Sequence, residues 1–157
     1  MKNDEEIKRG RPICAGSGRA ATAGLALVID CHTRELLGWH LSRSGKPSTA
    51  SSALGRVPQP FLLRSDNDLV FTSRDYTALA SSYGLRQEFI PPHCPQQNGM
   101  VERVIRTLKE QCAHHHRIET LQHASRVIGD WIGFYNNRRP RQALAMKTPA
   151  EASALAA

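Results

Sequence analysis

The stretch "GLALVIDCHTRELLGWHLS", residues 24–42, is the part of this 157-residue chain that points most directly to its fold class. It holds two runs rich in β-forming residues, Leu25 to Cys31 and Glu35 to Leu41. His32-Thr33-Arg34 separate the two runs, and this length suits the loop of a β-hairpin. The stretch therefore predicts an antiparallel pair of strands.

The segments after the hairpin alternate between strand and helix patterns. Residues 61–68, "FLLRSDND", read as a short buried strand that ends in acids, and "RQEFI", residues 86–90, reads as another. Between them, Thr72 or Ser73 is a candidate N-cap and Gly84 a candidate C-terminal stop, which predicts a helix.

Two amphipathic helices follow the last strand. One runs from Asn98 or Gly99 to about His114, and the other covers residues 121–137. A hairpin followed by strand, helix, strand and helix predicts an α/β fold with a mixed sheet.

The flanks of this pattern are less regular. Residues 1–23 are polar and rich in Gly, Ala and Ser, so we expect a poorly ordered or remnant first-strand segment with a short strand around Pro12 to Ala15. Arg43 to Pro60 leaves room for at most a short helix, around Thr49 to Leu54. The expected organisation is one domain over residues 24–152 and a tail over 153–157. The first strand and the helix that would cross over from the hairpin to the next strand, around Thr49 to Leu54, are the two elements for which the pattern is weakest.

Composition narrows the partners. Lys and Arg number 21 against 14 Asp and Glu, and the net charge of +7 favours a polyanionic partner. No apolar run is long enough to cross a bilayer and no signal-peptide pattern opens the chain, so we expect a cytoplasmic protein without a membrane partner. The four cysteines form no CxxC pair, and we expect reduced, mostly structural thiols.

Glu102 lies on the polar side of the helix that starts near Asn98. In the first turn of a helix it can simply favour the helix dipole and pair with Arg106. Another interpretation arises with Asp66, because 35 residues separate the two carboxylates and Asp66 ends a short apolar strand. Carboxylates placed at a strand end and on a nearby helix can hold divalent ions that promote phosphoryl transfer.

Four stretches carry a resemblance to a known family: "LALVIDCHTRELLGW" (25–39), "LLRSDNDLVFTSRDYTAL" (62–79), "YGLRQEFIPPHCPQQNGMVERVIRTLKEQC" (83–112) and "FYNNRRPRQALAMKTPAEA" (134–152). The stretch 62–79 is similar to an S/T-D-N-G strand end, and the stretch 83–112 is similar to a P-x-x-N-G-x-x-E helix. Together the stretches resemble the integrase-type DDE transposases of bacterial insertion sequences, which are relatives of retroviral integrase cores.

The resemblance implies an RNase H-like fold, a mixed sheet flanked by helices with the catalytic acids at one edge. It also implies cutting and joining of DNA strands with Mg²⁺ or Mn²⁺. Asp66 matches the second catalytic, metal-binding acid of the family, and Glu102 matches the third. DNA is the implied partner, and a homo-oligomer is an open alternative.

The first acid of the family has no match. It belongs to the first strand, yet Lys8 to Gly24 contain no Asp or Glu. Asp30 is expected to start the hairpin turn, and Asp68, in place of a family Gly, is expected to repel Asp66. We therefore expect an N-terminally truncated and impaired integrase or transposase core-like protein for DNA integration and transposition. The alternative is a non-catalytic nucleic-acid-binding remnant.

Basic residues supply the candidate DNA contacts. Arg103, Arg106 and Lys109 lie beside Glu102 in sequence, and Arg138 and Arg139 begin another basic patch. Lysine and arginine side chains can contact phosphates, whereas an arginine group can equally be a solubilising surface.

Overall fold

The computed structural model describes residues 12–20, 23–43, 52–53, 62–65, 69–91 and 99–156. Five strands form one mixed sheet in the order β3-β2-β1-β4-β5. Their bounds are β1 Pro12–Ala20, β2 Ala23–Asp30, β3 Leu36–Ser42, β4 Leu62–Ser65 and β5 Arg86–Phe89. β1, β2 and β3 pair antiparallel, whereas β1 with β4 and β4 with β5 pair parallel. The predicted α/β class with a mixed sheet is confirmed.

The predicted hairpin is β2 and β3. The Asp30 carboxylate accepts hydrogen bonds from the backbone N–H groups of His32 at 2.8 Å and Thr33 at 3.2 Å. Such side-chain bonds to the backbone two and three residues ahead stabilise a tight turn. Asp30 therefore starts the turn, as expected. Every residue of β2 is buried, because helices cover both faces of the sheet.

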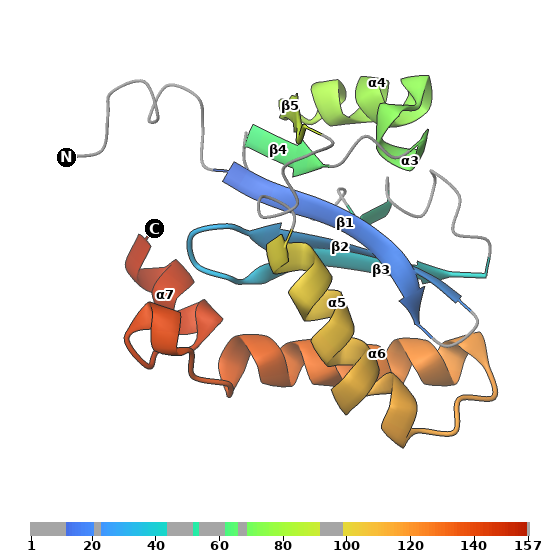
Figure 1. Cartoon of the computed structure of the whole chain (residues 1–157), viewed down its shortest axis with the longest axis vertical. Helices are drawn as coiled ribbons and strands as arrows, with labels where there is room; N and C mark the ends of the chain where they lie inside the picture. Colours follow the sequence, from blue (N-terminus) through green and yellow to red (C-terminus); the bar gives the residue numbers. More distant parts are fainter. Residues whose placement is uncertain are drawn as a thin grey trace.

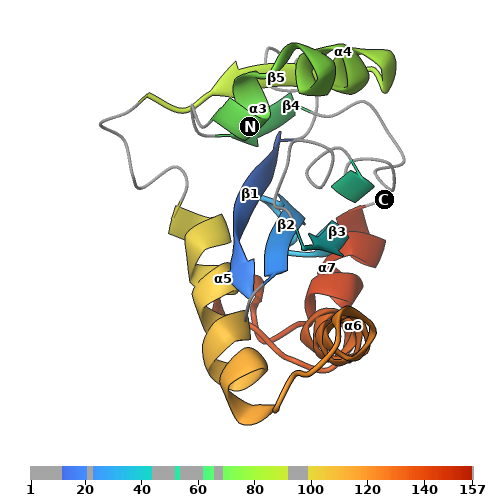
Figure 2. The ribbon, with the colours of Figure 1, turned by 90° about the vertical axis from the view of Figure 1, so that its right-hand side faces the viewer.

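Helices lie on both faces of the sheet (Figures 1 and 2). α3 Leu69–Thr72 and α4 Arg74–Ser82 cover one face, and α5 Gly99–Gln111 and α6 Leu121–Asn137 cover the other. Successive residues of β2 point to opposite faces, so Leu27 packs with residues of α5 and α6, whereas Val28 packs with residues of α4. α7 Pro149–Ala156 follows α6.

The helix predictions hold closely. Ser73 is the N-cap of α4 and accepts a hydrogen bond from the Tyr76 N–H at 3.3 Å, and Gly84 has the left-handed φ of 74° typical of a helix stop. α5 begins at Gly99 and a short 3₁₀ turn, Ala113–His115, follows it. Of the short helix expected around Thr49 to Leu54, Ser52 and Ala53 are helical, and the rest lies outside the described residues.

β1 is longer than the strand expected over Pro12 to Ala15. It extends to Ala20 and stands in the centre of the sheet, paired with β2 from Ile13↔Asp30 to Ala20↔Ala23 and with β4 at its start. The later part of β1, "GSGRA", has little β-propensity, so no local pattern indicated it. Backbone pairing of this part with β2 outweighs that low propensity.

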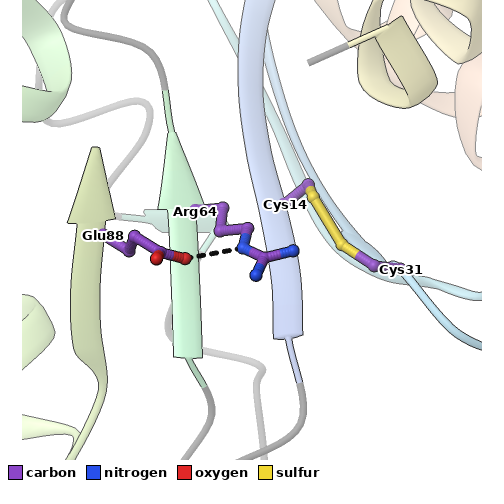
Figure 3. Close-up of polar contacts among 4 residues, drawn as sticks. All are labelled: Cys14, Cys31, Arg64 and Glu88. Atoms are coloured by element: carbon purple, nitrogen blue, oxygen red, sulfur yellow. Dashed lines mark hydrogen bonds and ion pairs between the residues drawn. A yellow bond between two sulfur atoms is a disulfide. The ribbon is translucent and has the colours of Figure 1, made fainter. Parts of the chain in front are cut away.

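One expectation about the cysteines is wrong. Cys14 and Cys31 form a disulfide, with their Cα atoms 6.3 Å apart (Figure 3). The spacing of the two cysteines along the chain gave no sign of this bond. They come together through the register of β1 and β2, which places Cys14 opposite Ile29, two residues before Cys31. Cys112 is a free, buried thiol, as predicted, and Cys94 lies outside the described residues.

Within the described residues, none of the helices is long and apolar enough to span a membrane.

Candidate carboxylate site and nucleic-acid surface

β4 carries the chain to the position predicted for the second acid. Its last residue, Ser65, is fully buried, and the Ser65 carbonyl accepts a hydrogen bond from the Ile90 N–H at 2.8 Å. On the same strand, Arg64 bridges to Glu88 of β5, with 2.7 Å between Nε and Oε2 (Figure 3). Asp66 and Asp68 follow directly and lie outside the described residues.

Glu102 is an exposed residue in the first turn of α5. Val101, Val104, Ile105 and Leu108 form the buried stripe of this helix, as predicted. Among the described residues, the Glu102 carboxylate makes no ion pair or hydrogen bond, so the pairing with Arg106 is not formed. The carboxylate is therefore available to a ligand.

Two glycines of β1 let α5 approach the sheet closely. A Cβ on Gly16 would collide with the Val101 side chain, and a Cβ on Gly18 would lie 3.0 Å from Cγ2 of Ile105. Glu102, next to Val101, thus stands close to the middle of β1. The parallel register pairs Cys14 with Arg64, so β1 passes beside the end of β4 before it passes under α5.

β1 supplies no carboxylate to this place. Pro12–Ala20 contains neither Asp nor Glu. Asp30 is buried and accepts hydrogen bonds from the hairpin turn. It belongs to β2, which β1 separates from β4. No group of three or more His, Cys, Asp or Glu residues that could hold a metal ion occurs in the part of the chain that the structure describes.

The predicted basic residues divide between the two flanks of α5. At 100° per residue, Arg106 and Lys109 share a flank with Glu102, whereas Arg103 shares the other flank with Gln111. Arg139 reaches that other flank, because its Nη1 donates a hydrogen bond to Gln111 Oε1 at 2.7 Å. Arg138 is exposed at the C-terminal end of α6.

Comparisons with known proteins identify the family. The model of the Integrase core domain matches residues 83–149. A protein of insertion element IS136 from Agrobacterium fabrum is 32% identical over 137 residues, which cover 80% of this chain and 70% of that protein. This chain belongs to the integrase core family of insertion elements. It is therefore an integrase or transposase catalytic core-like protein, as the sequence motifs indicated.

Other relatives agree with this assignment. The transposase for insertion sequence element IS904 of Lactococcus lactis is 28% identical over 138 residues, which are 83% of this chain and 54% of that transposase. A protein of insertion element IS407 from Burkholderia multivorans is 30% identical over 131 residues, 81% of this chain and 47% of that protein. This core-like chain thus spans about half the length of these two relatives.

Solved integrase cores share its fold. The catalytic core domain of BIV integrase superposes with a TM-score of 0.72 at 18% identity, covering 94% of this chain and 95% of that one. The HTLV-2 integrase catalytic core domain in complex with magnesium gives a TM-score of 0.72 at 13% identity, covering 90% of this chain and 95% of that one. The RNase H-like fold expected for this integrase core-like chain is confirmed.

Proposed function

We propose that this chain binds double-stranded DNA through α5 and the segment after α6, and that it cuts or joins DNA strands poorly or not at all. The observation that carries the proposal is the composition of β1. This strand lies beside β4 and under α5, and it has no carboxylate. Any strand transfer that remains would act in DNA integration and transposition. The proposed location is the cytoplasm.

The proposed metal ligands and catalytic residues are Asp66 and Glu102. Hard oxygen ligands suit Mg²⁺ or Mn²⁺, and Glu102 offers an exposed carboxylate that no described residue pairs with. Two acids without a third from β1 make an incomplete ligand set for a two-metal centre. The residues present therefore do not fit a full catalytic metal site, and no reaction step is assigned to a metal.

The proposed DNA contacts are Arg103, Arg106, Lys109, Arg138 and Arg139. Arg103, Arg106 and Arg138 are exposed, and Arg139 is held against α5 by Gln111. A net charge of +7 favours such contacts, because each phosphate that a cation neutralises releases counterions.

A salt series tests the binding half of the proposal. Fluorescence anisotropy of a labelled duplex should show sequence-tolerant binding that weakens steeply as salt rises. A folded sample that leaves every duplex unbound at low salt would end the claim on DNA, both for a catalytic protein and for a non-catalytic binding protein.

A cleavage assay tests the catalytic half. The parent chain, Asp66→Asn and Glu102→Gln are incubated in Mg²⁺ or Mn²⁺ with a labelled duplex and with supercoiled plasmid. We expect little or no nicking by any of the three, because a loosely held ion positions the attacking oxygen poorly. Cleavage by the parent that both substitutions abolish would show an intact active site and refute the impairment.

Oligomeric state is a separate part of the proposal. The HTLV-2 core is described in a trimeric form, and a homo-oligomer of this chain is the corresponding hypothesis. Sedimentation velocity at several protein concentrations distinguishes a monomer from an oligomer.

A further inference from the structure

We infer that Arg34, Arg103, Arg139 and Arg141, named here the arginine cluster, form a binding site for a backbone phosphate of DNA on the flank of α5 away from Glu102. The inference rests on the proposed DNA-binding function and goes beyond it. It adds Arg34 and Arg141 as ligand-binding residues and assigns them a defined chemical group.

Arg141 is the centre of the arginine cluster. Its guanidinium carbon lies 4.3 Å from the centroid of the Tyr135 ring, a cation–π contact that fixes the plane of the group. Its Nε is buried and has no hydrogen-bond partner among the described residues. A buried donor without an acceptor is costly, and because this nitrogen is covered by protein atoms, a ligand would meet the guanidinium through its other two nitrogens.

The backbone around Arg141 is held in one arrangement. The Arg141 N–H donates to the Lys147 carbonyl at 3.0 Å, and the Arg141 carbonyl accepts from the Met146 N–H at 2.9 Å. The connection closes through Ala145 and Met146, both with left-handed φ angles of 52° and 63°. The Arg141 backbone is therefore held in an ordered turn, and the contact with Tyr135 positions its side chain.

Arg34 comes to the same place from the β2–β3 hairpin. The Asn136 side chain on α6 receives a hydrogen bond from the Leu36 N–H and donates one to the Leu36 carbonyl, both at 3.0 Å. This two-point contact holds the start of β3 against the C-terminal end of α6. Arg34, two residues before Leu36, is close enough to influence the pKa of Tyr135 next to Asn136.

Arg103 and Arg139 complete the arginine cluster from α5 and from the segment after α6. Arg139 bonds Gln111 at the end of α5, about two turns along the helix from Arg103. In Figure 1 the turn of the β2–β3 hairpin and the C-terminal end of α6 lie on the side of the molecule where α7 lies. Three separate parts of the fold thus contribute positive charge to one region.

Three other arginines act on the charge of Arg141. Burial is the largest cause of the lowered pKa of Arg141, and Tyr135 opposes that shift. The charges of Arg139, Arg34 and Arg103 lower the pKa further, and no described carboxylate is among the groups that shift it. Gathered like charges repel one another, and a bound anion relieves that repulsion.

A phosphate is the anion that this arrangement suits. Arginine presents a planar fork of N–H donors that matches phosphate oxygens, and a fork already stacked on a ring loses little freedom on binding. Arg106 and Lys109 lie on the other flank of the same helix, whose diameter with side chains is about 10–12 Å. A duplex lying across α5 could therefore contact both flanks, which favours a DNA backbone phosphate over a free one.

The test compares single substitutions in the salt series. Arg34→Gln and Arg141→Gln should each weaken duplex binding about three-fold to ten-fold and reduce the slope of log K against log salt by about one contact. Arg117→Gln is the matched control. It removes the same charge at the opposite end of α6, where Arg117 is exposed and paired with Glu119. We expect its affinity and slope to equal those of the parent.

Further variants separate the site from the overall charge and from the fold. Arg141→Lys keeps the charge but loses the fork, so it should bind nearly as weakly as Arg141→Gln. Melting curves identify variants that fail to fold. If Arg141→Gln does not fold, the duplex affinity and salt slope of Arg34→Gln decide the test. If the parent binds DNA and the Arg34 and Arg141 variants bind it equally well, the arginine cluster is no phosphate site, while the proposed function stands.

A titration with free phosphate tests whether the arginine cluster binds free phosphate and not a DNA backbone phosphate. Inorganic phosphate is titrated against the parent and against Arg34→Gln/Arg141→Gln, with chloride at equal ionic strength as the control. A phosphate-dependent rise in Tm for the parent alone, together with loss of duplex affinity in the double variant, supports the inference. The same rise without any duplex binding by the parent would assign the site to free phosphate and overturn its role on DNA.

Discussion

At Gly16, β1 comes close to α5, because an added Cβ there would collide with Val101. Gly16→Ala should therefore destabilise the protein by about 1–3 kcal/mol, the usual cost of overpacking a core. Denaturant unfolding measures the change. Gly133→Ala is the matched control, since nothing lies within 4 Å of its added Cβ, and it should stabilise α6 by about 0.5–1 kcal/mol.

A double substitution at this contact tests its cause. Val101→Ala combined with Gly16→Ala should cost less than the two separate changes together, because the smaller side chain leaves room for the new methyl group. Additive losses would show that Gly16 is required for another reason.

Tyr76 makes stability depend on alkaline pH. Burial raises the pKa of its hydroxyl well above the usual value near 10, and the hydroxyl has no hydrogen-bond partner among the described residues. Above about pH 10 the unfolded chain loses this proton and the folded chain keeps it, so the folded state loses stability as pH rises.

Tyr76→Phe should accordingly retain the stability of the parent at pH 7 and lose less of it above about pH 10. Free energies of unfolding at the two pH values measure the difference. The exposed Tyr83→Phe serves as the control and should follow the parent. An equal alkaline loss in Tyr76→Phe and the parent would contradict the assignment.

Between elements, Asn136 joins α6 to β3 through its two hydrogen bonds with Leu36. Asn136→Ala leaves the Leu36 backbone groups without this partner, so it should cost about 1–3 kcal/mol and raise the hydrogen-exchange rate of the Leu36 amide. Asn137→Ala, which removes one exposed bond to the Gly133 carbonyl, should have a much smaller effect. Equal effects of the two substitutions would argue against a specific link at Asn136.

For the whole molecule, the Cys14–Cys31 disulfide should raise the stability of the entire sheet, because β1 is its central strand. A bond between cysteines 17 residues apart typically contributes about 2–4 kcal/mol. A reducing agent should lower the Tm of the parent and leave that of Cys14→Ser/Cys31→Ser unchanged. Non-reducing tryptic peptide mapping should recover residues 10–19 linked to residues 20–34. If the two peptides are found unlinked, the Cys14–Cys31 disulfide is not formed.

Much of the fold could be predicted from local pattern alone. Hydrophobic periodicity placed α6 on residues 121–137, and an N-cap with a later glycine placed α4 between Ser73 and Gly84. Such signals are carried by residues within a few positions of each other, so they are visible in the chain itself. The family was likewise evident from short motifs, and Glu102 stands exposed on the predicted helix.

The amino-acid order alone was therefore enough to predict the type and succession of most elements, the hairpin, the buried face of α5 and membership of the integrase core family. Three features emerged only from the folded chain: the extent of β1, the pairing of Cys14 with Cys31 and the influence of the Arg34 charge on Arg141. The physical reason is the same in each case. Each feature depends on residues that are distant in the chain. Strand register brings β1 and the two cysteines into place, and Asn136 bonds to Leu36 across 100 residues. Local propensity carries no information about such long-range pairs.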